Sequence, residues 1–295
     1  MRSPPKTVAG LSKASELRAM TIGEVIRRTT EHLESRGSTT PRLDAELLLG
    51  KALGLERIEL YMQHDRPLDQ AELDRARELV ARRARREPLQ YVLGEWGFRR
   101  LTLTVDRRAL IPRPETETLV ERALAAIAGV SAPRVLDVGT GTGAIALAIA
   151  DEHPGATVTG IDISNDALAL AAENVERTGL AVTLGPGDFR AGLPAGPWDL
   201  VVSNPPYVTE RERTALEPEV RDHEPELALY GEDSYAVLVP AAERVLAPGG
   251  LLAVEVGDDQ AAPVVALFES GGLCEVTTTR DLAGRERVVE GRRAD

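Results

Sequence analysis

Residues 135–145 read VLDVGTGTGAI, an apolar stretch that passes through three closely spaced glycines into an alanine-rich segment. This order predicts a strand, a tight turn and a helix. Glycine permits the tight turn and lets the backbone approach a ligand closely. The stretch therefore predicts a ligand site at the turn, although a dinucleotide motif or a purely structural turn would have the same pattern.

The chain around this stretch alternates between strands and helices. We expect strands at 134–138, 157–161, 181–184, 199–203, 251–256, 275–279 and 287–290, and helices that include 144–150, 166–178 and 235–246. This alternation predicts an α/β domain whose mostly parallel sheet is covered by helices on both faces.

The amino-terminal part differs, because helix signals follow one another there without strands between them. Thr21 with Glu24 and Asp69 with Glu72 have the spacing of capping boxes, and Met20 is a candidate start of translation. The predicted organisation is a flexible tail, a helical N-terminal domain, a β connector and an α/β domain, at residues 1–20, 21–88, 89–112 and 113–295.

The composition excludes several classes of protein. Of the 295 residues, 43% are hydrophobic and 28% are charged, which argues against extended disorder. No apolar run approaches the roughly 18 residues of a membrane span, and the first 20 residues lack the apolar core of a secretory signal. One cysteine, Cys274, and four scattered histidines favour neither a disulfide nor a metal site. We therefore expect a soluble cytoplasmic protein without metal.

The charge distribution argues against broad binding to a nucleic-acid backbone, because the formal net charge is −12. Residues 66–113 nevertheless carry 12 basic against 7 acidic side chains. Among them, Arg82, Arg83, Arg85 and Arg86 lie on the last turns of a predicted helix. A solvated helix end is the plain interpretation, and a docking surface for an acidic partner is the alternative.

Two residues beyond the glycine turn fit a nucleoside. Asp162 ends the next predicted strand, where a carboxylate can accept hydrogen bonds from ribose hydroxyls. Phe189 follows the third strand, where its ring can flank an adenine or simply pack in the core. These residues predict a nucleoside-type cofactor and leave both NAD and S-adenosylmethionine open.

Residues 199–207, DLVVSNPPY, end a buried strand with a motif that carries chemistry. The side-chain oxygen of Asn204 and the carbonyl of Pro205 can accept both hydrogens of one planar amino group, and Tyr207 can lie against its face. The lone pair of such a nitrogen is delocalised, which makes the nitrogen a poor nucleophile. Two acceptors that bind its hydrogens return electron density to the nitrogen and direct the lone pair along one line. Displacement at a sulfonium methyl then needs mainly positioning and electrostatics. The motif favours methyl transfer to nitrogen, with an ordinary Pro-Pro turn as the structural alternative.

With these residues the chain resembles the release-factor glutamine methyltransferases, the HemK/PrmC family of class I S-adenosylmethionine-dependent methyltransferases, over about residues 21–291. Asn-Pro-Pro-Tyr is shared with adenine methyltransferases, whereas IPRPETE at 111–117, preceded by QYVLGEWGF at 90–98, is much more particular to this family. Residues 224–235 are one residue shorter than in many relatives, which leaves the shape of a lid open.

The resemblance implies a fold, a cofactor and a substrate. The fold is a small all-helical N-terminal domain, a β-hairpin linker and a Rossmann-like seven-stranded methyltransferase sheet whose last strand is antiparallel. The implied activity is protein-(glutamine-N5) methylation, in which S-adenosyl-L-methionine methylates the glutamine of the Gly-Gly-Gln motif in class I peptide chain release factors. A cytoplasmic monomer that contacts neither nucleic acid nor membrane is the simplest expectation.

The same resemblance implies roles for individual residues. Asp162 would hold the ribose and Phe189 would lie beside the adenine. The residues expected at the methionine part of the cofactor are Gly139, Thr140, Gly141, Thr142 and Gly143. The residues expected at the substrate are Asn204, Pro205, Pro206 and Tyr207, of which Asn204 and Pro205 are catalytic and Asn204 also lies near the cofactor. Arg113 and Glu117 would close the site from the linker, unless they only cap a helix start.

Other functions fit fewer of these residues. A methyltransferase for a glutamine of a large-subunit ribosomal protein shares Asn-Pro-Pro-Tyr, but its linker lacks a clean IPRPETE. An adenine methyltransferase acting on DNA or RNA would need a basic groove and usually a target-recognition region, whereas the catalytic half of this chain is strongly acidic. An NAD-dependent dehydrogenase would not explain Asn204–Tyr207, and a non-catalytic cofactor-binding module would tolerate the loss of Asn204.

Overall fold

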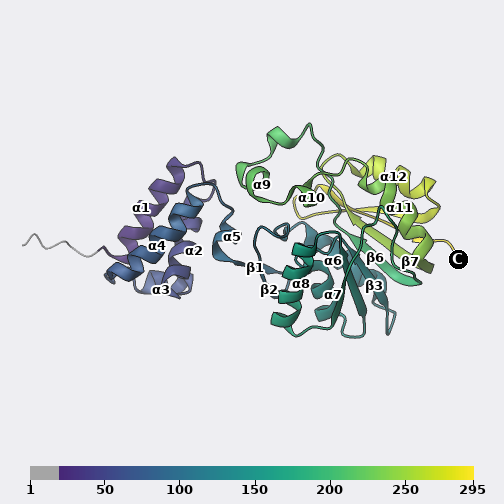
Figure 1. The fold of residues 1–295 in the computed structure, drawn as a ribbon, viewed down its shortest axis with the longest axis horizontal. Coiled ribbons are helices and arrows are strands. Elements are labelled where there is room, and N and C mark those ends of the chain that lie inside the picture. The colour runs from purple at the N-terminus through teal and green to yellow at the C-terminus, as the bar shows by residue number, and fades with distance from the viewer. Residues whose placement is uncertain (1–19) are drawn as a thin grey trace, which may run out of the picture. The chain divides into compact units, whose positions relative to one another are not determined.

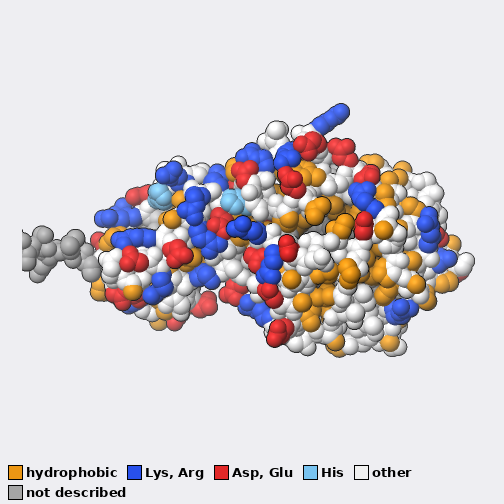
Figure 2. All heavy atoms as spheres, viewed as in Figure 1, with side chains coloured by type: hydrophobic (Ala, Val, Ile, Leu, Met, Phe, Trp, Pro, Cys, Tyr) orange, Lys and Arg blue, Asp and Glu red, His pale blue; other side chains and the backbone are white. Residues whose placement is uncertain are grey.

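The computed structural model describes residues 20–295, which form two compact units divided after Arg85 (Figure 1). The flexible tail expected at residues 1–20 lies outside the described residues, except for Met20. None of the described helices is long and apolar enough to cross a bilayer. On the face shown in Figure 2, acidic and basic side chains are interspersed, and hydrophobic side chains gather on the larger unit.

The described residues of the helical unit form four helices around a small apolar core. Their bounds are α1 (Ile22–Ser35), α2 (Pro41–Leu53), α3 (Arg57–Met62) and α4 (Gln70–Arg83). Thr21 and Asp69 cap α1 and α4 through the expected capping boxes. The core includes Ile22, Leu49 and Leu60. Leu60 comes from the six-residue α3, which the sequence pattern did not predict.

The arginine cluster at the end of α4 does not form one solvated face. Arg83 is buried, and its Nε donates to Asp44 Oδ2 at 2.8 Å. Arg86 begins the second unit, and its Nε donates to Glu219 Oε1 at 2.7 Å. Because at least two of the four guanidinium groups bind carboxylates within their own units, the cluster is a poorer docking surface than the sequence suggests.

A short helix and a hairpin open the second unit. Helix α5 (Leu89–Leu93) precedes the antiparallel strands β1 (Glu95–Phe98) and β2 (Leu101–Thr104). The β connector expected from residue 89 therefore begins with a helix. Leu89 and Val92 lie one helical turn apart and are both buried, and Gly94 ends the helix with a φ of +74°.

Seven strands form the main sheet in the order β5-β4-β3-β6-β7-β9-β8. Six run parallel, and β9 runs antiparallel between β7 and β8, which confirms the predicted α/β fold and its antiparallel last strand. The strands are β3 (Arg134–Val138), β4 (Thr157–Asp162), β5 (Val182–Pro186), β6 (Trp198–Ser203), β7 (Leu246–Glu255), β8 (Leu273–Arg280) and β9 (Glu286–Arg293). The helices are α6 (Thr116–Ile127), α7 (Ala144–Glu152), α8 (Asn165–Thr178), α9 (Pro218–His223), α10 (Glu226–Leu229), α11 (Ser234–Val245) and α12 (Ala261–Ser270).

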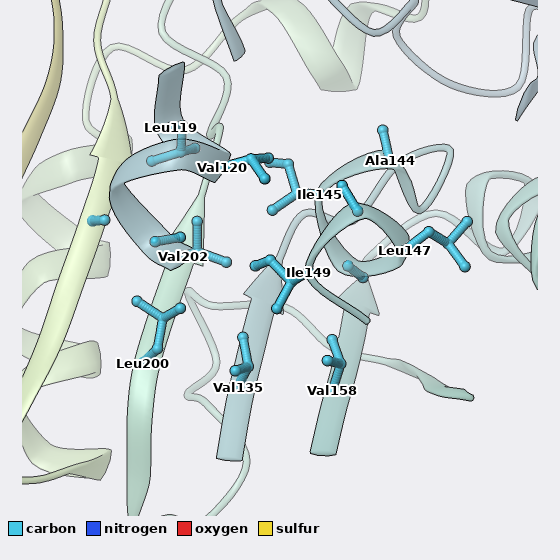
Figure 3. Close-up of a cluster of buried hydrophobic side chains, with 14 of the residues drawn as sticks. Leu119, Val120, Val135, Ala144, Ile145, Leu147, Ile149, Val158, Leu200 and Val202 are labelled. Atoms are coloured by element: carbon cyan, nitrogen blue, oxygen red, sulfur yellow. The ribbon is translucent and has the colours of Figure 1, made fainter. Parts of the chain in front are cut away.

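Side chains that alternate along the strands divide the core into two layers. Val135 points to the face covered by α6 and α7, where it joins a cluster with Leu119 and Ile149 (Figure 3). Its neighbour Leu136 belongs to the layer packed against α11 and α12. Burial on both faces explains why the strands are continuous apolar runs, and the parallel order brings the carboxyl ends of β3, β4 and β6 to one edge.

Candidate active site

A cavity of about 220 Å³ opens at the carboxyl ends of β3, β4 and β6. Open α/β sheets bind ligands at this edge. The structure brings most of the expected cofactor residues to its walls, namely Gly139, Thr140, Gly141, Thr142, Asp162, Phe189 and Asn204. The expected substrate residues Pro206 and Arg113 line it as well.

The turn between β3 and α7 adopts backbone conformations that favour glycine. Gly139, Gly141 and Gly143 have φ values of +73°, +56° and +81°. Gly143 is the N-cap of α7, and a Cβ there would lie 3.3 Å from Leu147 Cδ1. Gly143 therefore faces the core, whereas Gly139 and Gly141 bring backbone to the cavity wall.

Two carboxylates lie beside this turn. Asp162 Oδ2 accepts from the backbone N–H of Gly141 at 2.9 Å, and its Oδ1 accepts from that of Ser164 at 2.9 Å. Asp137 Oδ2 accepts from Thr140 Oγ1 at 2.6 Å, whereas no described residue hydrogen-bonds to its buried Oδ1. Burial raises the pKa of Asp162, and it raises the pKa of Asp137 to about 7. Asp162 lines the cavity, and an acceptor at this position suits a ligand that carries hydrogen-bond donors or positive charge.

The Asn204–Tyr207 segment follows β6 and lies between two cavities. Asn204 and Pro206 line the first cavity, and Tyr207 lines a second one of about 460 Å³. Pro205 is buried. The segment thus presents one polar side chain to the first cavity and one aromatic ring to the second.

Two buried residues that the sequence analysis did not single out contact this segment. Thr116 opens α6, and its Oγ1 donates to Glu255 Oε2 at 2.6 Å and accepts from Asn204 Nδ2 at 3.3 Å. Tyr207 Oη donates to the other oxygen of Glu255 at 3.4 Å. Thr116 lies inside the IPRPETE motif, and a charged residue at the end of the apolar β7 was the available signal for Glu255.

Residues 208–233 form a lid that contains α9 and α10, and its residue Leu227 lines the first cavity. Buried Glu224 ties the lid to the segment before α6. Its Oε1 accepts from Arg113 Nη2 at 2.5 Å, and its Oε2 accepts from the backbone N–H of Ile111 at 3.3 Å. Burial raises the pKa of Glu224, while the Arg113 guanidinium opposes this shift.

The part of the lid that departs from the family pattern packs against the substrate motif. A Cβ on Gly231 would lie 2.5 Å from the carbonyl oxygen of Pro206 and 2.3 Å from Ser234 Oγ. Glycine at this position therefore lets the lid approach Pro206 closely.

Glu117 points away from both cavities. Its Oε1 accepts from the backbone N–H of Arg99 at 3.0 Å, in the turn between β1 and β2. Consecutive residues of an α-helix point about 100° apart. Because Thr116 faces the cavity, its neighbour Glu117 is directed to the hairpin, where it holds β1 and β2 against α6.

The variant Arg113→Met is expected to loosen the lid. It would leave the buried carboxylate of Glu224 without its cation, and removing one partner of a buried pair costs about 3–5 kcal/mol. Hydrogen exchange followed by mass spectrometry should show faster exchange in the lid, including the amide of Val208 that donates to Leu229. The control Arg213→Met removes an exposed ion pair within the lid, and equal exchange in the two variants would contradict this role of Arg113.

Comparison with known proteins assigns the chain to a family. A family model described as the PrmC N-terminal domain matches residues 24–94, and one described as the methyltransferase small domain matches residues 116–222. A release factor glutamine methyltransferase of Geobacter sulfurreducens is 46% identical over 276 residues, which cover 92% of this chain and 96% of the relative. The chain belongs to the release factor glutamine methyltransferase family. The resemblance seen in the sequence is thereby confirmed.

Further comparisons agree with membership of the release factor glutamine methyltransferase family. A second relative of that name, from Caulobacter vibrioides, is 42% identical over 278 residues, which again cover 92% of this chain and 96% of the relative. Among solved structures, the catalytic domain of hMettl16 has a TM-score of 0.57 at 17% identity, over 74% of this chain and 83% of that one. This likeness shows the methyltransferase fold alone.

Proposed function

We propose that this protein transfers a methyl group from S-adenosyl-L-methionine to the side-chain amide nitrogen of the glutamine in the Gly-Gly-Gln motif of class I peptide chain release factors. The observation that carries the proposal is the placement of Asn204. Its Nδ2 donates to Thr116, which leaves its side-chain oxygen to accept from a substrate amide. The printed names of the relatives support release factors as the protein substrate.

The residues around the first cavity fit S-adenosylmethionine. The glycine turn exposes backbone to the cavity, and the carboxylate of Asp162 lines it. Asp137 Oδ1, a buried acceptor without a donor among the described residues, lies beside the same turn. We place the methionine part of the cofactor at this turn, its ribose at Asp162 and its adenine beside Phe189. When bound there, the cofactor supplies an electrophilic methyl group.

The chain's own residues would prepare the substrate nitrogen. The oxygen of Asn204 and the carbonyl of Pro205 would accept the two hydrogens of the glutamine amide, which opposes delocalisation of the nitrogen lone pair and directs it to the first cavity. Tyr207 would limit the tilt of the amide plane. The transfer would break the S–CH3 bond of the sulfonium, whose electron pair stays on sulfur as a thioether, and would replace one N–H bond of the amide by an N–CH3 bond. The displaced hydrogen would leave as a proton to water.

We propose further that the protein acts as a monomer in the cytoplasm, where release factors function, without binding nucleic acid or membrane. The net charge of −12 and the mixed charges of the visible surface support the absence of a nucleic-acid partner. Light scattering after size exclusion tests the monomer, and a mass near 31.8 kDa is expected.

The decisive experiment incubates the protein with S-adenosylmethionine and a purified class I release factor and maps added methyl groups by peptide mass spectrometry. We expect one methyl group on the Gly-Gly-Gln glutamine, and none with Asn204→Ala. Absence of this methyl group, while calorimetry shows cofactor binding, would contradict the proposed substrate. Ribosomal proteins and nucleic acids would then be tested as methyl acceptors.

A further inference from the structure

One carboxylate is linked to both ends of the substrate motif, to Tyr207 directly and to Asn204 through Thr116. Glu255 is 1% exposed and ends β7, while Thr116 is 4% exposed and opens α6. One oxygen of Glu255 accepts from Thr116 at 2.6 Å, and the other accepts from Tyr207 at 3.4 Å. Thr116 in turn accepts from Asn204 at 3.3 Å. The two polar side chains of Asn-Pro-Pro-Tyr are therefore linked through a single buried group.

The direction of these hydrogen bonds follows from the chemistry of a hydroxyl group. Thr116 has one hydroxyl hydrogen, and a carboxylate can only accept, so that hydrogen goes to Glu255. Thr116 then offers only lone pairs to Asn204. The Nδ2 end of the Asn204 amide must face Thr116, and the Oδ1 end must face away from it.

The backbone of the motif is anchored at the same place. Gln260 Nε2 donates to the carbonyl of Tyr207 at 3.0 Å, and Gln260 Oε1 accepts from the amide of Gly257 at 3.2 Å. Tyr235 Oη donates to the backbone carbonyl of Glu255 at 3.0 Å. The end of β7 is thus a rigid support for the motif that follows β6.

We propose that Thr116 and Glu255 are positioning residues that select the orientation of the Asn204 amide, so that its oxygen and not its nitrogen meets the substrate. The inference rests on the proposed function for its substrate, and it assigns no contact with substrate to either residue. Thr116 acts on Asn204 directly, and Glu255 acts through Thr116 and on the Tyr207 ring.

This arrangement has a pH dependence of defined sign. Burial raises the pKa of Glu255 to about 7, while Thr116 and the Arg287 guanidinium lower it. Above that pH the carboxylate enforces the orientation. Below it, the protonated carboxyl can donate to Thr116 Oγ1, whose own hydrogen is then free to point at Asn204. The oxygen of Asn204 would be drawn to Thr116, and activity should fall as the pH drops through 7.

Several other charged groups face Glu255. Arg287 comes from β9, and Glu115, just before α6, raises the pKa of Glu255. The other charged residues that line its cavity are Arg113, Glu212, Asp258 and Arg285. Burial raises the pKa values of Tyr207 and Tyr235 above the ordinary range, so these phenols stay protonated near neutrality. Asp137 beside the glycine turn also has a pKa of about 7, so variants must separate the two carboxylates.

The orientation can be measured without any substrate. The chain has only three asparagines, at positions 165, 174 and 204, so selective ¹⁵N-asparagine labelling gives three side-chain amide signals in an NMR spectrum. We expect the Asn204 side-chain signal to titrate with a midpoint near pH 7, and to lose this titration in Glu255→Gln and Thr116→Val. Asn165, which is exposed, and Asn174, which donates to backbone carbonyls, serve as internal references.

Kinetics with a release factor give the second readout. Thr116→Val should lower kcat by about ten- to hundredfold, as for a misdirected reacting group, with little change in the KM for S-adenosylmethionine. Thr116→Ser keeps the hydroxyl and should restore most of kcat. Glu255→Gln should lower kcat and should abolish the fall in kcat that we expect as the pH drops through 7. Glu290→Gln neutralises another buried carboxylate on the neighbouring strand β9, which binds Arg122 and Thr277 and not the motif, and should leave kcat and the profile unchanged.

The outcomes separate this inference from the proposed function. An Asn204 signal that does not respond to pH or to the Thr116 and Glu255 variants would overturn the positioning role, whichever substrate is methylated. Equal kcat for Thr116→Val, Thr116→Ser and the unaltered protein would overturn it as well. A titrating signal in a protein that fails to methylate release factors would support the positioning role and contradict only the proposed substrate.

Discussion

Asn204→Ala is expected to lower kcat for release factor methylation by about 10²–10³-fold, the range for losing one preorganised polar group at a reacting centre. The variant removes the only side-chain acceptor that the motif offers to the substrate amide, and it leaves the Pro205 carbonyl in place. The dissociation constant for S-adenosylmethionine should change only modestly, because the cofactor is held mainly at the glycine turn and Asp162. Single-turnover kinetics with calorimetry separates these two quantities.

The control for this prediction is Asn165→Ala, which removes an exposed asparagine at the start of α8. It should retain the kcat of the unaltered protein. If Asn204→Ala lost cofactor affinity and turnover to the same extent, Asn204 would belong chiefly to the cofactor site, and its assignment to the substrate amide would be wrong.

Asp162→Ala is expected to weaken cofactor binding about 10- to 100-fold. The carboxylate is placed to accept from the ribose hydroxyls, and hydrogen bonds to a charged group contribute about 1.5–3 kcal/mol each. The variant also leaves the amides of Gly141 and Ser164 without their acceptor, which loosens the turn. Isothermal calorimetry with S-adenosylmethionine measures the effect.

The control for this second prediction is Asp166→Ala, a change in the first turn of α8 that lies outside the cavity lining. It should leave the affinity unchanged. An Asp162→Ala protein that binds the cofactor as tightly as the control would remove Asp162 from the cofactor site.

The fold was predictable because its signals are local. Each of these signals spans only a few consecutive residues, as the glycine turn, the apolar strands and the capping boxes at Thr21 and Asp69 do. The structure accordingly has strands and helices close to the expected bounds. The short helices α3 and α5 were not predicted, since five or six residues are too few to show a helical period.

The site was only partly predictable, because its support comes from distant pairs. Thr116 and Glu255 are 139 residues apart in the chain, and Glu224 and Ile111 are 113 apart. No local pattern specifies which side chains meet across the sheet edge. The sequence motif also cannot tell which of two adjacent residues on α6 faces inward, so Glu117 was expected at the site where Thr116 lies.

The two carboxylates beside the glycine turn couple cofactor binding to the exchange of protons with the solvent. Burial raises the pKa of Asp162, which lines the first cavity, and brings that of Asp137, which lies beside the turn, to about 7, so without the cofactor this pair of carboxylates binds a fraction of a proton near neutrality. A bound cation lowers both pKa values and releases that fraction. Affinity for S-adenosylmethionine should therefore rise with pH up to about 7 and then level off. The positive charge of the cofactor thus takes the place of a proton. The number of protons released can be obtained by measuring the binding enthalpy in buffers of different ionisation enthalpy.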